Sequence, residues 1–122
     1  MFDHIGIGVS DLHASKTFFL RALAPLGVGV VMEFPHAAGL GRAQKPSLWL
    51  GGAKGDPLPL HLAFVADSRS QVDEFYKQAL AAGGEDNGPP GIRPHYHANY
   101  YAAFVIGPDG HNVEAVCHLP EA

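Results

Sequence analysis

Apolar and polar positions along the chain repeat the same succession of elements twice. Residues 4–9 (HIGIGV) and 61–66 (HLAFVA) are short apolar segments, which is typical of strands. Each is followed by helical periodicity and then by further strand-like segments. These later segments are Val28 to Phe34 and Ser47 to Leu50 in the first copy, joined by a turn from Pro35 to Gly41, and Ala98 to Ile106 and Asn112 to His118 in the second, joined by the turn Gly107-Pro108-Asp109-Gly110.

The two helical patterns carry matching start and stop signals. Ser10 or Asp11 is the candidate cap of the first, and Ser68 with Gln71 has the spacing of a capping box at the second. Apolar residues then recur at helical spacing, and a glycine ends each pattern. The apolar faces are Leu12, Phe19, Ala22, Leu23 and Leu26 before Gly27, and Val72, Phe75, Tyr76, Ala79 and Leu80 before Gly84.

An offset of 57 residues aligns the copies without a gap. It superimposes His4 on His61, Phe18 on Phe75, Phe19 on Tyr76, Ala22 on Ala79, Leu23 on Leu80, Ala24 on Ala81 and Gly27 on Gly84. Two unrelated amphipathic helices would also share some aromatic and alanine positions, but the ungapped register and the histidine that opens both strands favour a true repeat. We therefore expect one α+β domain, residues 1–122, made of two βαβββ modules in tandem, 1–54 and 55–122, that form a curved, half-open mixed sheet.

Composition excludes several classes of function. The chain is 47% hydrophobic and 16% charged, with no apolar run long enough to span a membrane. Its formal charge is −4 and its basic residues are scattered, so we expect neither nucleic acid nor membrane partners. With Cys117 alone, no disulfide forms within the chain. The first residues, MFDHIGIGVSDL, lack the features of an export signal, which favours a cytoplasmic location.

Alternation along the strands brings two histidines and one acid to the same side. Ile5 and its odd-numbered neighbours form the apolar face that packs under the helices, so His4 faces away from them, and the repeat gives His61 the same place. Glu114 lies between apolar neighbours, where a carboxylate needs a partner. Two imidazoles and one carboxylate suit one divalent metal ion, Fe(II) above all, with Mn, Ni or Zn also feasible. The simpler alternative is a strand histidine satisfied by hydrogen bonds and a solvated glutamate.

Three segments carry a resemblance to a known family: DHIGIGVSDLHASKTFF, LHLAFVADSRSQVDEFYKQALAAGG and YYAAFVIGPDGHNVEAVCH. They resemble the vicinal oxygen chelate superfamily, which includes glyoxalase I, the fosfomycin- and bleomycin-resistance proteins and the extradiol dioxygenases. The resemblance spans essentially the whole chain. It implies the fold above and metal ligands on the first and last strands of the modules, hence His4, His61 and Glu114.

The sequence also departs from parts of that family. The fourth ligand position falls in Ser47 to Leu50, most closely at Trp49, which cannot bind a metal, and this argues against glyoxalase I. Gly6 stands where the fosfomycin transferases place a threonine, and their phosphonate-binding cations are not matched. The set resembles that of the extradiol dioxygenases, whereas bleomycin-type binders use the fold without metal.

A polar aromatic segment from Arg93 to Tyr101 leads into the expected strand from Ala98 to Ile106. If the turn centres between Pro108 and Asp109, Glu114 pairs with Ala103, and Tyr101, Asn99 and His97 share its face. Tyr101 and His97 are then candidates for proton transfer. A register slip of one residue would bring Tyr96 and Tyr100 inward instead. We expect Trp49, Arg93, Asn99 and Phe104 to contact a small-molecule substrate.

The other histidines carry weaker signals. His13, His36 and His111 occupy helix starts and turns, where solvent exposure and no function are expected. His118 shares the face of Glu114 and is a reserve candidate, and Cys117 is expected to be a small buried residue.

Three functions fit these patterns. The first is a metal-dependent isomerase, lyase or dioxygenase that acts on a small substrate with neighbouring oxygen atoms. The second is a metal-free module that sequesters an apolar or aromatic molecule, with Trp49, Phe104 and the tyrosines as walls. The third is a small subunit whose sheet serves as a dimer surface; an open sheet edge favours a homodimer in each case.

Overall fold

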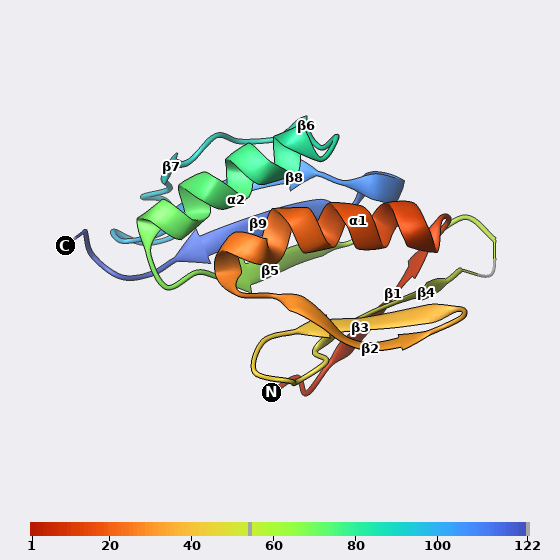
Figure 1. Ribbon diagram of the computed structural model, residues 1–122. Helices are drawn as coiled ribbons and strands as arrows, with labels where there is room; N and C mark the ends of the chain where they lie inside the picture. Colours follow the sequence, from red (N-terminus) through yellow and green to blue (C-terminus); the bar gives the residue numbers. More distant parts are fainter. Residues whose placement is uncertain (54, 122) are drawn as a thin grey trace.

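The computed structural model describes residues 1–53 and 55–121 and forms two similar halves (Figure 1). The expected module boundary at residue 54 and the terminal residue 122 lie outside the described part. The first half contains β1 (Ile5–Val9), α1 (Leu12–Leu23), η1 (Ala24–Leu26), β2 (Gly29–Phe34), β3 (Ala37–Gly41) and β4 (Leu48–Gly52). The second contains β5 (His61–Val65), α2 (Arg69–Ala81), β6 (Glu85–Asp86), β7 (Gly91–Ile92), β8 (Tyr101–Ile106), η2 (Pro108–Gly110) and β9 (Asn112–Cys117).

The strands form two mixed sheets of the same design. The first has the order β1-β4-β3-β2, and the second has the order β5-β9-β8-β6, with β7 also paired to β8. The first strand of each half runs parallel to the last strand, and the remaining pairs are antiparallel. This arrangement confirms the predicted fold class.

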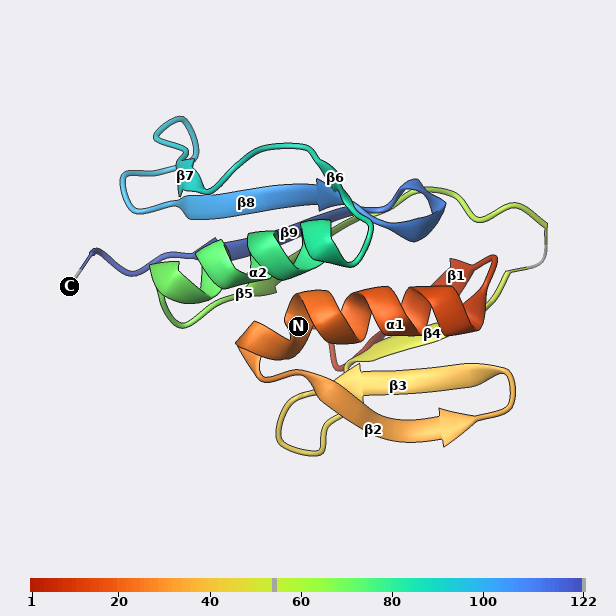
Figure 2. The same cartoon turned by 45° about the horizontal axis from the view of Figure 1, so that its top comes forward.

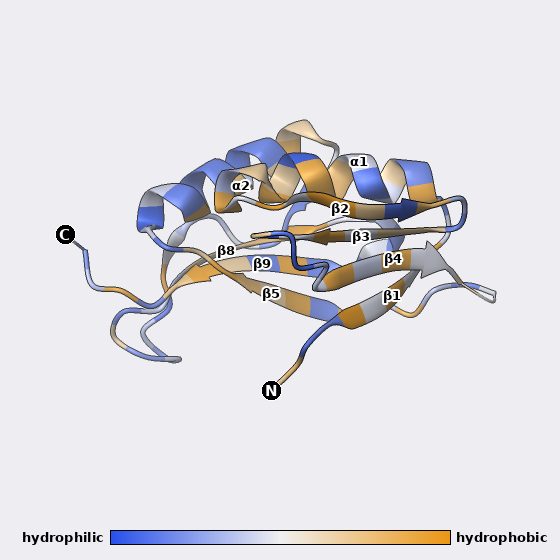
Figure 3. Cartoon of the chain, turned by 60° about the horizontal axis from the view of Figure 1, so that its bottom comes forward, coloured by the Kyte–Doolittle hydropathy of each residue, from blue (hydrophilic) through white to orange (hydrophobic). Residues whose placement is uncertain are grey.

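Both helices cover the same side of the sheets. They lie side by side, α1 over the first sheet and α2 over the second (Figure 2). The opposite side is free of helices, and β1 and β5 lie next to each other at its centre (Figure 3). One hydrophobic core joins both halves under the helices. Its largest fully buried side chains are those of Phe19, Phe75, Leu23, Leu40, Leu50, Val9, Val72, Val105 and Val113.

The helix starts follow from the capping signals. The side chain of Asp11 accepts a hydrogen bond from the amide of Ala14, so Asp11 rather than Ser10 is the cap of α1. At α2 the hydroxyl of Ser68 accepts from the amide of Gln71, whose side-chain oxygen accepts from the amide of Asp67. These bonds satisfy amides that have no partner within the helix.

Two segment boundaries differ from the prediction. The segment from Pro35 to Gly41, expected as a turn, contains the strand β3 at Ala37–Gly41, because Ala38 and Leu40 are buried against the helices while backbone pairing with β2 and β4 continues. The strand expected from Ala98 begins instead at Tyr101. The residues before Tyr101 form a loop, in which the amide of Tyr100 donates to the carbonyl of His97.

His111 was expected at the surface, and this expectation is wrong. Its side chain is only 1% exposed. The amide of Leu60 donates to Nδ1 of His111 at 2.9 Å, so the ring proton lies on Nε2, which is 3.3 Å from the carbonyl oxygen of Gly8. His111 therefore ties the start of β5 to β1, across the boundary between the halves.

Within the described residues, no helix is long and apolar enough to span a membrane.

Candidate metal and substrate site

The helix-free side of the second sheet contains one buried carboxylate, that of Glu114 on β9. Glu114 is only 1% exposed. Nε2 of His61 on β5 lies 2.7 Å from Oε1 of Glu114, and the hydroxyl of Tyr100 donates a hydrogen bond to Oε2. His61 itself is half exposed. One imidazole nitrogen and one carboxylate oxygen, both of the types that bind metals, are therefore in contact on this face of the sheet.

Tyr100 reaches Glu114 from the loop that precedes β8. Burial first, and then its hydrogen bond to Glu114, raise the pKa of Tyr100 well above the usual range of a phenol. Tyr100 therefore stays protonated at neutral pH and is a constant hydrogen-bond donor to the carboxylate. Rings of His97 and His118 lie edge-on to it, at 5.4 and 5.3 Å.

Phe104 lies beside His61, and Arg93 lies against Phe104. Phe104 pairs directly with Glu114 across β8 and β9, and its ring centre is 6.2 Å from that of His61. The guanidinium of Arg93 lies 5.3 Å from the Phe104 ring and donates to the carbonyl oxygens of Gly91 and Pro89. Of the predicted substrate contacts, Phe104 is thereby placed next to the His61 and Glu114 pair, and Arg93 is placed against Phe104.

His4 stands just before β1, at the edge where the two sheets meet. Its Nδ1 lies 2.7 Å from Oδ1 of Asp3, and the other carboxylate oxygen of Asp3 lies 2.5 Å from the ammonium of Lys45. A carboxylate only accepts hydrogen bonds, so the proton of a neutral His4 ring is on Nδ1. Its Nε2 is left with a free lone pair, which is the form that binds metals.

His4 and His61 line one shared cavity of about 290 Å³ between β1 and β5. Its other walls come from Phe2, Asp3, Ile5, Ser47, Leu62, Ala63 and Phe64. In the parts of the chain that are described, no three His, Cys, Asp or Glu side chains are close enough together to hold a metal as they stand. Two of the three predicted ligands, His61 and Glu114, are in contact, and the third, His4, lines the same cavity as His61. The donor types are those that a divalent metal takes, but the three side chains are not gathered around one point.

Trp49 occupies the position in the first sheet that Glu114 has in the second. Trp49 pairs with Gly6 on β1 as Glu114 pairs with Ala63 on β5, and Gly6 and Ala63 are 57 residues apart. The register confirms the position predicted for Trp49. Its ring stacks on Phe34 at 6.2 Å and lies over Gly39, where a Cβ atom would be 3.0 Å from the indole. This half of the face is therefore aromatic and carries no metal ligand at that position.

The prediction that Tyr101 shares the face of Glu114 is wrong. The connection between β8 and β9 is centred on Asp109, which has a φ of 62°, and not between Pro108 and Asp109. As a result, Glu114 pairs with Phe104 rather than with Ala103. Tyr101 pairs with Cys117 and points to the helices, where its hydroxyl lies 2.5 Å from Asp73 of α2. Tyr100 takes the place that was expected for Tyr101.

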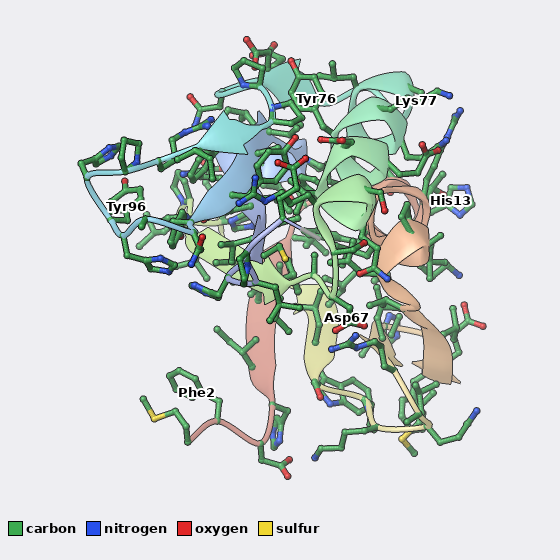
Figure 4. All side chains as sticks on the ribbon, turned by 90° about the vertical axis from the view of Figure 1, so that its left-hand side faces the viewer. Phe2, His13, Asp67, Tyr76, Lys77 and Tyr96 are labelled. Carbon is green, nitrogen blue, oxygen red and sulfur yellow. The ribbon has the colours of Figure 1, made fainter. Side chains whose placement is uncertain are left out.

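His97 and Asn99 lie in the loop before β8, so the strand pairing that placed them does not extend to them. The amide of Asn99 donates to Nδ1 of His97, and Nε2 of His97 lies 2.6 Å from Nδ1 of His118. The two histidines are exposed neighbours of Tyr100 and do not touch Glu114. Figure 4 shows Tyr96 on the same loop, on the side away from the helix residues His13 and Lys77. The sequence signal for Tyr100 was the alternative register, which predicted Tyr96 and Tyr100 to point inward. Tyr100 does so, whereas Tyr96 is 58% exposed.

Comparison with known proteins settles the family. The model of the Glyoxalase/Bleomycin resistance protein/Dioxygenase superfamily matches residues 1–115. The chain belongs to this superfamily. A glyoxalase/bleomycin resistance protein from Albidiferax ferrireducens T118 is 28% identical, with a TM-score of 0.83, and the alignment covers 98% of this chain and 99% of that one.

More distant superfamily structures share the fold. A putative glyoxalase from Bacillus halodurans is 23% identical, with a TM-score of 0.74 and coverage of 96% of this chain and 95% of that one. A structure described as oxidase ChaP-H2 is 22% identical, with a TM-score of 0.69 and coverage of 100% and 95%. The comparison with curated proteins gives no match. The superfamily contains both enzymes and binding proteins, so the activity must be argued from the site.

Proposed function

We propose that this superfamily member is a divalent-metal-dependent enzyme that acts on a small substrate with neighbouring oxygen atoms, as a lyase, isomerase or dioxygenase. The observation that carries the proposal is the contact between buried Glu114 and His61 at a cavity that His4 also lines. A buried carboxylate with a histidine partner at a cavity is a common feature of functional sites.

In the proposed enzyme, His4, His61 and Glu114 hold one ion, of Fe, Mn, Ni or Zn. When bound, such an ion polarises substrate oxygens or lowers the pKa of a bound water. The chain's own residues have the supporting roles. Asp3 fixes the tautomer of His4, Tyr100 keeps one carboxylate oxygen of Glu114 hydrogen-bonded, and Phe104 and Trp49 form apolar walls that exclude water from the substrate.

Metal analysis tests this proposal directly. Protein without a histidine tag is dialysed against zinc and manganese in turn, and bound metal and dissociation constants are measured. We expect about one ion per chain, with affinity at least tenfold weaker in Glu114→Gln and in His61→Gln. His36→Gln, in the exposed turn between β2 and β3, is the matched control and should bind as the wild type does. Equal affinity in all four proteins would contradict the assignment.

A metal-free binding protein is the second candidate function. It is favoured by the aromatic pair Phe34 and Trp49 and by the turn of His4 toward Asp3 rather than toward His61. If the protein takes up no metal but binds a catechol, with a change in the fluorescence of its one tryptophan, this second function is the better one.

We also propose that the protein is a cytoplasmic homodimer whose partners are small molecules and another copy of itself, not nucleic acid or membranes. Support comes from the apolar side chains exposed on and beside the sheets, which include Phe2, Val30, Met32, Phe34 and Val65. Sedimentation that shows a monomer at tens of micromolar would contradict the dimer.

A further inference from the structure

A second cavity, the rear cavity, lies behind the one that His4 and His61 line, on the helix side of the gap between the two sheets. Its volume is about 240 Å³. Apolar side chains of both halves make its walls, among them Leu26, Val28, Leu40, Leu48 and Phe64. Ile5, Ser47 and Phe64 line both this cavity and the one that holds His4 and His61, so the two adjoin at these residues.

The charges at the rim of the rear cavity are already paired. Arg42 lies 3.4 Å from Asp67 and donates to the carbonyl of Leu26, and Lys45 is held by Asp3. Among the described residues, the buried polar side-chain atoms without a partner, Ser15 Oγ and Arg69 Nε, are not in its lining. The two cations of the lining are therefore already engaged by carboxylates, and most of the remaining lining is apolar, which favours an uncharged apolar group over a charged one.

The size of the rear cavity suits part of a molecule. Pockets that hold a whole drug-sized ligand usually measure about 300–1,000 Å³, and an apolar cavity of about 150 Å³ is large enough for benzene. A volume of about 240 Å³ therefore accommodates a small ring or a short alkyl chain.

We infer that the substrate has two parts: an oxygen-bearing head in the His4 and His61 cavity, and an uncharged alkyl or aryl group that passes Ile5, Ser47 and Phe64 into the rear cavity. This inference rests on the proposed function for the head. It defines the substrate class as a small chelating molecule with one apolar substituent.

The test is a series of 4-alkylcatechols bound to the zinc-loaded protein, since zinc has no redox chemistry that would consume them. Dissociation constants for catechol and its methyl, propyl and hexyl derivatives are measured by calorimetry. Each methylene that enters an apolar cavity should tighten binding about three- to fourfold until the cavity is full. An affinity that is independent of chain length overturns the inference.

Val28→Phe fills the rear cavity from a half-buried position and should remove the gain from the alkyl chain while catechol itself binds as before. Val65→Phe, at an exposed position that lines the rear cavity and not the His4 and His61 cavity, serves the same purpose if Val28→Phe does not fold. Val30→Phe, on exposed β2 and outside both linings, is the control and should keep the full gain. An equal gain in all variants also overturns the inference.

The outcomes separate this inference from the proposed function. If catechol binds the zinc-loaded protein and the alkyl chain does not tighten binding, the inference of a two-part substrate is wrong, while the proposed metal site is unaffected. If neither zinc nor manganese binds, the proposed function fails. In that case, toluene is added to the metal-free protein and its binding is monitored through the NMR chemical shifts of the Leu40 and Leu48 methyl groups. This measurement still decides whether the rear cavity accepts an apolar group.

Discussion

Arg21 and Gln78 occupy the same position in the two halves of the chain, 57 residues apart, and they hydrogen-bond to each other: Nε of Arg21 is 3.3 Å from Oε1 of Gln78. Equivalent residues of a repeat meet only near its pseudo-twofold axis. The axis therefore passes between α1 and α2, and on the other side of the sheets it passes between β1 and β5. This is why His4 and His61, which are also equivalent, line one cavity.

Removing the hydroxyl of Tyr100 should destabilise the protein. In Tyr100→Phe, Oε2 of the buried Glu114 loses its donor, and an unsatisfied buried group costs roughly 1–3 kcal/mol of unfolding free energy. Urea unfolding at pH 7 measures the change. Tyr96→Phe, whose side chain is 58% exposed on the same loop, should change stability by less than about 0.5 kcal/mol. Equal effects of the two substitutions would show that Tyr100 does not support Glu114.

Stability should fall at alkaline pH. Burial, followed by the hydrogen bond to Asp73, raises the pKa of Tyr101 to about 12, compared with about 10 in an unfolded chain. The folded protein thus keeps a proton that the unfolded chain loses, and the free energy of unfolding decreases from about pH 10 until the folded group titrates near pH 12. Urea unfolding between about pH 8.5 and 11.5 should show this slope, and Tyr101→Phe should make it shallower. Identical slopes would contradict the prediction.

Asp3 should matter for metal binding more than for folding. In Asp3→Asn, His4 loses the carboxylate that holds its proton on Nδ1. The ring is then no longer fixed in the tautomer that leaves the lone pair of Nε2 available, and we expect metal affinity to fall about tenfold. Both side chains are exposed, so the urea midpoint should stay close to that of the wild type. Lys45→Gln leaves the Asp3 carboxylate in place and should have a smaller effect. Nitrogen NMR shifts of His4 in the metal-free protein report the tautomer without any activity measurement.

His111 should be a stability residue and not a site residue. His111→Phe keeps the ring volume but leaves the amide of Leu60 without its acceptor, which should cost roughly 1–3 kcal/mol. Metal affinity should remain within about threefold of wild type after correction for the folded fraction. His13→Phe, on the outer side of α1, is the control for replacing a histidine ring. A large loss of metal affinity in folded His111→Phe would contradict this role.

The sequence predicted the architecture well because the repeat constrains both halves at once. His4 and His61, the helix caps and the place of Trp49 all follow from one offset of 57 residues and from strand alternation. The errors arise where one residue of register decides the outcome. A turn centred on Asp109 instead of between Pro108 and Asp109 exchanges Tyr101 for Tyr100, and the sequence does not determine the turn length.

The burial of His111 has a different origin. Its partners, Leu60 and Gly8, come from the starts and ends of other strands, 51 and 103 residues away. No local pattern reports a contact across the two halves, so a histidine after a turn looked like a surface residue. The assignment of His4, His61 and Glu114 to a metal stays a prediction, for which the contact of His61 with Glu114 is support.

The equivalence of Trp49 and Glu114 gives the helix-free face a direction. A perfectly repeated face would have two identical ends, and a ligand could bind in either of two orientations. Here one end has a carboxylate in contact with an imidazole and the other has an indole stacked on a phenyl ring. In the proposed enzyme, a substrate that lies along this face is therefore bound in one of its two orientations, the one that brings its oxygens to His61 and Glu114.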